Sequence, residues 1–224
     1  MKKKNILIIA GLIIVVSIVT LIIRIFLSKD KLNLEPYQKY NMLVSIDTFH
    51  DGANKKYTIN FTDDGANARL YSNIENFDGF LLENKLCYAY QDTIYSIDLK
   101  RNYRNLNEIL GNLKKGDLVD KKADGIARYS SLLKLGVVNK LLDALGIEKD
   151  TKNSVILKFV VSARHVSSAN FTVSDLEGYG KTEIMITFKE LNEDFKVNTD
   201  VLTNNPHRLY KQVTLSENPL SIMR

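Results

Sequence analysis

The sequence predicts an α+β protein in which a single N-terminal transmembrane helix precedes a curved antiparallel β-sheet with a helical insertion over its concave face. Three observations lead to this fold class. A long apolar run fills positions 5–27. From position 40 onward, short segments alternate apolar and polar residues with a period of two, as strands do. Between two sets of such segments lies a stretch whose apolar residues recur every three or four positions, which is the period of an amphipathic helix.

The apolar run at positions 5–27 has the length of a transmembrane helix. A helix of this length covers about 30 Å, which matches the hydrocarbon thickness of a bilayer. Its only charge, Arg24, lies near the end, where the guanidinium can reach the interface. Three lysines precede the run and favour the cytoplasmic side. The prediction is a single-pass cell-membrane protein with cytoplasmic residues 1–4, a spacer at 28–40 and an extracytoplasmic domain at 41–200.

A cleaved signal peptide is the alternative interpretation of the same run. Signal peptides have an apolar core of about 7–15 residues and a small-x-small cleavage site. Here the apolar run is longer, and the following IFLSKD at 25–30 contains no such site. A retained anchor in contact with the lipid bilayer is therefore favoured. Cleavage after Leu27 or Ser28 would instead release a soluble domain.

Charge and cysteine content narrow the class of partner. The formal net charge is +5, but the excess of Lys and Arg lies at positions 1–31 and the rest of the chain is formally neutral. The basic balance therefore belongs to the anchor, and no nucleic-acid partner is expected. Cys87 is the only cysteine, so the chain cannot form an internal disulfide.

Strands are expected on both sides of a helical insertion at 103–147. In the insertion, a short helix is expected at 105–113 and a longer one at 124–145, where an apolar stripe ends just before Gly146. A hairpin is expected at 168–176 and 182–191, with a short strand at 195–197. Residues 201–224 have no clear period and form either a tail or a strap over the sheet. The other expected strands are 42–46, 57–61, 69–74, 80–82, 86–90, 93–99 and 154–163.

The residues that commonly carry catalysis or bind metals do not form a recognisable pattern. The histidines His50, His165 and His207 lie far apart, and none has a second ligand at metal spacing. Cys87 lies in an expected strand, where a buried and inert thiol is the ordinary outcome. No Gly-rich phosphate loop and no Gly-x-Ser-x-Gly motif occurs. No enzyme activity, catalytic residue, metal or cofactor is therefore predicted.

Four tyrosines crowd one expected strand pair, 86–90 and 93–99, and its exit: Tyr88, Tyr90, Tyr95 and Tyr103. Aromatic residues on antiparallel sheets commonly pack across strands, which is the favoured interpretation. A surface that contacts sugar or lipid is the alternative.

Two stretches resemble the bacterial lipoprotein-carrier fold, the LolA/LppX-like superfamily, which includes the RseB-type envelope regulators. FLLENKLCYAY at 80–90 with TIYSIDL at 93–99 resembles the family's meander, although Lys85 follows Asn84 where the family often has Gly. SSANFTV at 167–173 with GKTEIMITF at 180–188 resembles its late hairpin. The resemblance covers about 40–197 and implies an unclosed half-barrel whose apolar concavity holds an acyl chain or is plugged by helices.

The leading hypothesis is a non-catalytic, membrane-anchored protein that binds an apolar or amphipathic ligand, such as a lipid or the acyl chain of a lipoprotein. A protein–protein module is the alternative: a sensor or regulatory subunit of a bacterial envelope complex with a membrane-protein partner. A cell-wall hydrolase or transferase is a third option. The residues expected to line the concave face are Met42, Val44, Ile46, Tyr57, Ile59, Phe61, Leu157, Phe159, Ile184, Ile186 and Phe188.

Overall fold

A computed structural model describes residues 32–50, 52–73, 77–82, 85–90, 93–98, 102–123, 127–147, 155–174, 180–203 and 209–212. The chain divides into two compact units, Met1–Asn33 and Leu34–Arg224. The expected transmembrane helix at 5–27 lies outside the described residues. Within the part of the chain that the structure describes, no helix is long and apolar enough to cross a bilayer.

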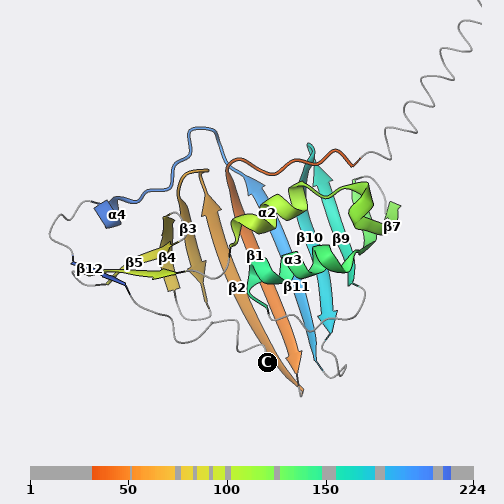
Figure 1. Cartoon of the computed structure of the whole chain (residues 1–224), viewed down its shortest axis with the longest axis horizontal. Helices are drawn as coiled ribbons and strands as arrows, with labels where there is room; N and C mark the ends of the chain where they lie inside the picture. The colour runs from red at the N-terminus through yellow and green to blue at the C-terminus, as the bar shows by residue number, and fades with distance from the viewer. Residues whose placement is uncertain are drawn as a thin grey trace, which may run out of the picture. The chain divides into compact units, whose positions relative to one another are not determined.

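The second unit is built on one sheet of twelve strands (Figure 1). Neighbouring strands are antiparallel, except that β12 runs parallel to β6. The order across the sheet is β12-β6-β5-β4-β3-β2-β1-β11-β10-β9-β8-β7. The strands are β1 (Tyr40–His50), β2 (Ala53–Asp63), β3 (Ala68–Ser72), β4 (Phe77–Leu82), β5 (Lys85–Tyr90), β6 (Thr93–Asp98), β7 (Leu118–Ala123), β8 (Arg128–Leu133), β9 (Val155–Ser162), β10 (His165–Ser174), β11 (Lys181–Glu190) and β12 (Leu209–Gln212).

The long hairpins follow the alternation seen in the sequence. In β1, Met42, Val44 and Ile46 are fully buried, while the intervening side chains reach the other face. Gly52 turns the chain between β1 and β2 with φ = +76°, a conformation that glycine adopts without steric cost. The expected hairpin of β10 and β11 is confirmed, with Phe171 opposite Ile184.

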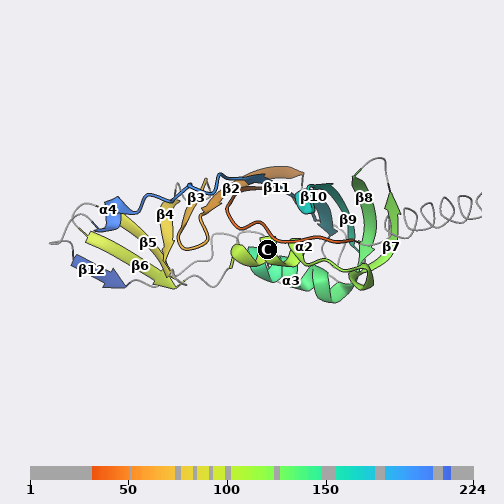
Figure 2. The ribbon, with the colours of Figure 1, turned by 90° about the horizontal axis from the view of Figure 1, so that it is seen from above.

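Helices cover one face of the sheet, as the sequence predicts for its insertion. Figure 2 shows α2 (Arg104–Gly111) and α3 (Leu135–Leu145) on the same side of the sheet, with the β9–β7 end curving down beside them. The helix α3 ends at Gly146, whose φ is +70° and whose N–H donates to the carbonyls of Leu142 and Asp143. This end agrees with the sequence-based expectation.

The prediction of a single long helix at 124–145 is wrong for the first half of that range. The insertion also contains a 3₁₀ turn, η1 (Lys115–Asp117), and the edge strands β7 and β8, so 103–147 is not wholly helical. Tyr129 and Leu133 belong to β8, and α3 begins only at Leu135. Residues four apart lie on one face of a strand as well as of a helix. The spacing of Tyr129 and Leu133 therefore fits both structures.

The segment after β11 packs over the other end of the sheet. Val197 and Leu202 are buried against Phe80, Cys87 and Ile94 of β4–β6. The short helix α4 (Asp200–Thr203) carries Leu202, whereas the strand expected at 195–197 is a loop. Of residues 201–224, the structure describes only 201–203 and β12, and β12 joins the sheet edge beside β6.

The carboxylate of Asp64 holds this segment to the turn after β2. It accepts hydrogen bonds from the backbone N–H groups of Val197 (2.8 Å), Asn67 (2.7 Å) and Ala66 (2.9 Å). Burial by itself would raise the pKa of Asp64, but these N–H groups and the charge of Lys39 together lower it below its usual value. The bond to Val197 joins chain segments that lie far apart in the sequence.

Candidate functional site

The face of the sheet under α2 and α3 contains every residue that the sequence predicts to line a concave surface. All of them except Tyr57 are at most 6% exposed, and Tyr57 is half-buried in the middle of β2. These side chains belong to β1, β2, β9 and β11, at the centre of the sheet. Their assignment to a ligand stays a prediction, because burial alone is also what a protein core requires.

Strand register gathers these residues into rows that cross the sheet. The middle row is the longest and is apolar throughout, so this face is continuous from β2 to β8. The three rows are Phe61–Met42–Phe188, Ile59–Val44–Ile186–Ala169–Phe159–Tyr129 and Tyr57–Ile46–Ile184–Phe171. Leu157 lies opposite Ser131 of β8 in the same sheet.

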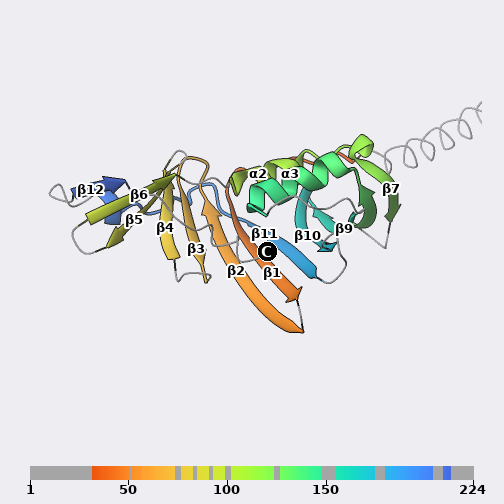
Figure 3. The same ribbon diagram turned by 60° about the horizontal axis from the view of Figure 1, so that its bottom comes forward.

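Two short helices, rather than a second sheet, cover this face. The helix α2 buries Leu106 and Leu110, and α3, on the same side of the sheet, also buries apolar residues (Figure 2). Figure 3 shows the two helices side by side along the sheet. The buried apolar residues of α3 are Val138, Leu141, Leu142, Ala144 and Leu145.

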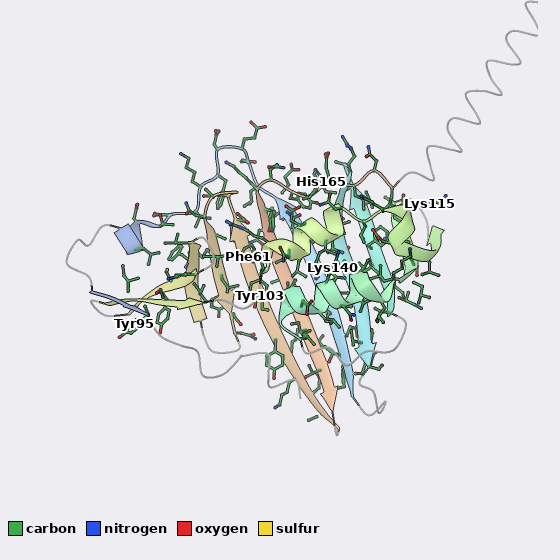
Figure 4. The ribbon with its side chains drawn as sticks, in the orientation of Figure 1. Phe61, Tyr95, Tyr103, Lys115, Lys140 and His165 are labelled. Carbon is green, nitrogen blue, oxygen red and sulfur yellow. The ribbon has the colours of Figure 1, made fainter. Side chains whose placement is uncertain are left out.

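The entry to α2 joins the helical layer to the sheet. Tyr103, directly before α2, is 2% exposed, and its ring centroid lies 5.9 Å from that of Phe61. Figure 4 shows Phe61 and Tyr103 close together, while Lys140 marks the middle of α3. Lys140 is exposed, so α3 presents a polar side away from the sheet.

A buried ion pair holds the start of α2 to the end of β2. The Nε and Nη2 atoms of Arg104 donate to the two carboxylate oxygens of Asp63 at 2.7 and 3.2 Å. The side chain of Asp63 is 4% exposed and that of Arg104 is 29% exposed. Burial, followed by the Asp63 charge, raises the pKa of nearby Tyr40 well above its usual value. Tyr40 is therefore a neutral phenol at physiological pH.

The chain that enters the domain is bound to the other end of α2. Residues 34–39 run beside this helix (Figure 2). From here on, the term strap means these N-terminal residues and not the C-terminal segment 201–224. The side-chain amide of Asn107 accepts from the Tyr37 N–H (2.9 Å) and donates to the Tyr37 carbonyl (2.8 Å). A Cβ added to Gly111 would lie 2.4 Å from the backbone nitrogen of Pro36. The last turn of α2 therefore tolerates only glycine beside the strap.

The β9–β10 turn holds the strap from the opposite side. The backbone N–H of Glu35 donates to the Arg164 carbonyl (3.0 Å), and Nδ1 of His165 donates to the Glu35 carbonyl (2.8 Å). The Arg164 guanidinium lies 3.1 Å from the Glu35 carboxylate. The ring of His165 stacks on that of Tyr37 at 4.4 Å. His165 is therefore a structural residue, and the spacer predicted at 28–40 is part of the fold from residue 34 onward.

The packing of Tyr88 against Tyr95 confirms the expected cross-strand contact between tyrosines. They lie opposite each other on β5 and β6, with ring centroids 5.2 Å apart and planes 16° apart. Tyr103 does not belong to this group, because it packs on Phe61 instead. The side chain of Tyr90 lies outside the described residues.

Catalytic and metal-binding groups were also sought in the described ranges. There, no group of three or more His, Cys, Asp and Glu side chains could hold a metal ion. The side chain of His50 and the whole of His207 are not among the described parts of the chain. Cys87 is a free, buried thiol, and its pKa is raised by burial, an effect that Lys85 offsets only in part. A thiol with a raised pKa is a poor nucleophile at neutral pH.

Among solved structures, comparison finds proteins that are similar to this chain, and one of them is a LolA superfamily protein. The chain is similar to a LolA superfamily protein from Nitrosomonas europaea, with 14% identity, a TM-score of 0.33, and coverage of 73% of this chain and 91% of that one. It is also similar to a DUF1329 family protein from Desulfovibrio piger, with 12% identity, a TM-score of 0.27, and coverage of 73% and 89%. No protein-family model and no curated protein sequence matches the chain.

Sequence reasoning missed the polar contacts that fasten the helical cover. Asp63 and Arg104 are 41 positions apart, and Tyr37 and Asn107 are 70 apart, so no local pattern links either pair. The apolar side of α2 did carry a signal, because Leu106 and Leu110 lie four positions apart within an expected helix.

Proposed function

We propose that this chain is a membrane-anchored extracytoplasmic protein that binds an apolar or amphipathic ligand, a lipid or the acyl chain of a lipoprotein, without catalysing a reaction. The observation that carries the proposal is the continuous apolar face across β2, β1, β11, β10 and β9 with its cover of two helices. A helical cover can move as a unit, because the hydrogen bonds of a helix are internal to it.

The free energy of burying the apolar side chains of α3 is comparable to that of burying an acyl chain in their place. Burying a Leu or Val side chain contributes about 1.5–3 kcal/mol, so the four large apolar residues of α3 contribute about 8 kcal/mol. An acyl chain contributes about 0.8 kcal/mol for each buried methylene group. About ten methylene groups would therefore offset the loss of the α3 contacts. Exchange of α3 for a long acyl chain is close to balanced, which suits a carrier or a reversible sensor.

The polar contacts of α2 define how the cover would open. Arg104 ties the first turn of α2 to β2, and Asn107 ties its middle to the strap. The proposal is therefore that α2 remains with the strap while the cover opens.

Competition between fatty acids of increasing length for a fluorescent stearate probe tests the proposal. The full chain in detergent is used, and saturable binding is expected. Affinity should rise about fourfold for each added methylene group until the face is filled. The length series separates this site from detergent-like adsorption, which is not saturable. Absence of saturable binding at every chain length would contradict the proposal.

A further inference from the structure

The opposite face of the sheet carries a separate pocket of about 220 Å³. Three residues of its lining alternate along their strands with buried residues. Lys158 is next to Phe159, Asn170 is next to Ala169, and Met185 lies between Ile184 and Ile186. Their side chains therefore point away from the face that α2 and α3 cover. The pocket belongs to the sheet formed by β8, β9, β10 and β11. Its lining also includes Tyr129, Phe159 and Ala169, strand positions whose side chains belong to the covered face.

Strand register places two cations at this pocket. Met185 lies opposite Asn170, which lies opposite Lys158. In the neighbouring row, Val160 of β9 lies opposite Arg128. Lys158 and Arg128 are thus diagonal neighbours on adjacent strands, a relation in which the backbones are about 7–8 Å apart. Both long side chains can reach one small ligand placed between them.

Neither of these cations is neutralised within the described part of the chain. The side chains of Arg128 and Lys158 make no hydrogen bond or ion pair with the residues described there. A described carboxylate in an adjacent row, that of Glu183, accepts from the amide of Asn170 (3.3 Å) and lies 3.9 Å from Nζ of Lys181. Counting only the described residues, the pocket therefore has a local excess of positive charge, although residues 32–224 as a whole are formally neutral.

We propose that this pocket binds a phosphate group, either as a lipid headgroup or as a free phosphate. Arg128 can donate two parallel hydrogen bonds to phosphate oxygens, and Lys158 supplies a second charge. Ser168 and Asn170 add polar groups to the lining, and Met185 and Val160 add an apolar wall. Pockets for drug-sized ligands have about 300–1,000 Å³. This smaller volume suits a headgroup rather than an acyl chain.

The methionines provide a direct readout. The chain contains four methionines, and two of them mark the two faces: Met185 lines this pocket, while Met42 is fully buried beneath the helices. The full chain, labelled with ¹³C at the methionine methyl groups, is prepared in a neutral detergent. Signals are assigned by Met185→Leu and Met42→Leu. Inorganic phosphate is titrated in one arm, and phosphatidylglycerol or phosphatidylcholine is added to the micelles in the others.

The expected result is a saturable shift of the Met185 signal with phosphate or with phosphatidylglycerol, and none with phosphatidylcholine. A shift with inorganic phosphate identifies a free phosphate as sufficient, whereas a shift with phosphatidylglycerol alone identifies the lipid headgroup. The double variant Arg128→Gln/Lys158→Gln should weaken binding about thirtyfold, because each basic residue near an anionic headgroup contributes about a fivefold factor. The control Lys55→Gln/Lys189→Gln removes the same charge at exposed positions elsewhere and should leave the affinity unchanged.

Three outcomes would overturn the proposal: no Met185 shift in any arm, an equal shift with phosphatidylcholine, or an equal loss of affinity in the control. Movement of Met42 reports on the acyl site instead. If the proposed acyl site is wrong, the Met42 signal stays unchanged with every lipid, whatever the Met185 signal does. The two proposals can therefore fail separately.

Discussion

Replacing Arg104 with methionine tests whether the ion pair with Asp63 fastens the helical cover. Methionine keeps most of the side-chain length and the helix propensity but removes the charge. Asp63 would then be a carboxylate with 4% side-chain exposure and no cationic partner. Removing one partner of a fully buried ion pair costs about 3–5 kcal/mol. Asp63 retains the N–H of Gly65 (2.8 Å) and Arg104 is 29% exposed, so we expect a loss of about 2–3 kcal/mol.

The chain contains a matched control for this substitution. Arg69 makes a bidentate pair with Asp78, with distances of 2.9 and 2.5 Å, but the two side chains are 56% and 44% exposed. Exposed pairs contribute about 0–1 kcal/mol, so Arg69→Met should cost less than 1 kcal/mol. Urea unfolding of the full chain in detergent measures both free energies. Equal losses for the two variants would refute the reasoning, and so would faster hydrogen exchange in α3 without any change in α2.

The remaining predictions concern the strap, the Asp64 turn and the thiol. Gly111→Ala should lower the free energy of unfolding by at least about 2 kcal/mol because its Cβ meets the Pro36 backbone, whereas Gly136→Ala, with open space around it, should be neutral or stabilise by up to about 1 kcal/mol in the same urea assay. The lowered pKa of Asp64 means that its ionised form stabilises the fold above the unfolded pKa of about 3.9; the stability difference between wild type and Asp64→Asn should therefore shrink as pH falls through the folded pKa, and a difference constant from pH 7 to pH 3 would contradict this. Cys87 should react with iodoacetamide on the order of a hundredfold more slowly in the folded chain than in urea, and similar rates would show that the thiol is accessible.

Alternation of apolar residues was a reliable guide to the sheet. Strands such as β1 and β11 bury one face and leave the other partly exposed, so the period of two in the sequence reports the environment directly. The error at β8 has a different origin. Tyr129 and Leu133 satisfy both periods, and Gly136, which indicates a break in the apolar stripe, lies inside the first turn of α3 rather than at the boundary itself. The order of the strands came only from the structure, since β1 pairs with β11 across most of the chain.

The residues of the covered face could be predicted from the sequence, but the contacts that hold the helices over that face could not. The buried positions of β1, β2 and β11 follow from their alternation with polar neighbours. The contacts that hold the cover do not, because Asn107 acts on the backbone of Tyr37, and a backbone group leaves no trace in sequence composition. The pocket at Arg128 was equally hidden, because two isolated cations on different strands become neighbours only through register.

The most direct test of the proposed function is photocrosslinking of a diazirine-bearing fatty acid to the full chain, with the adducts located by mass spectrometry. An acyl chain under α2 and α3 predicts adducts on residues of the covered face, such as Met42, Phe61 and Ile186, and competition by unlabelled palmitate. Adducts confined to the opposite face, at residues such as Leu43 and Met185, would contradict binding beneath the helices. The same conclusion would follow if palmitate failed to compete.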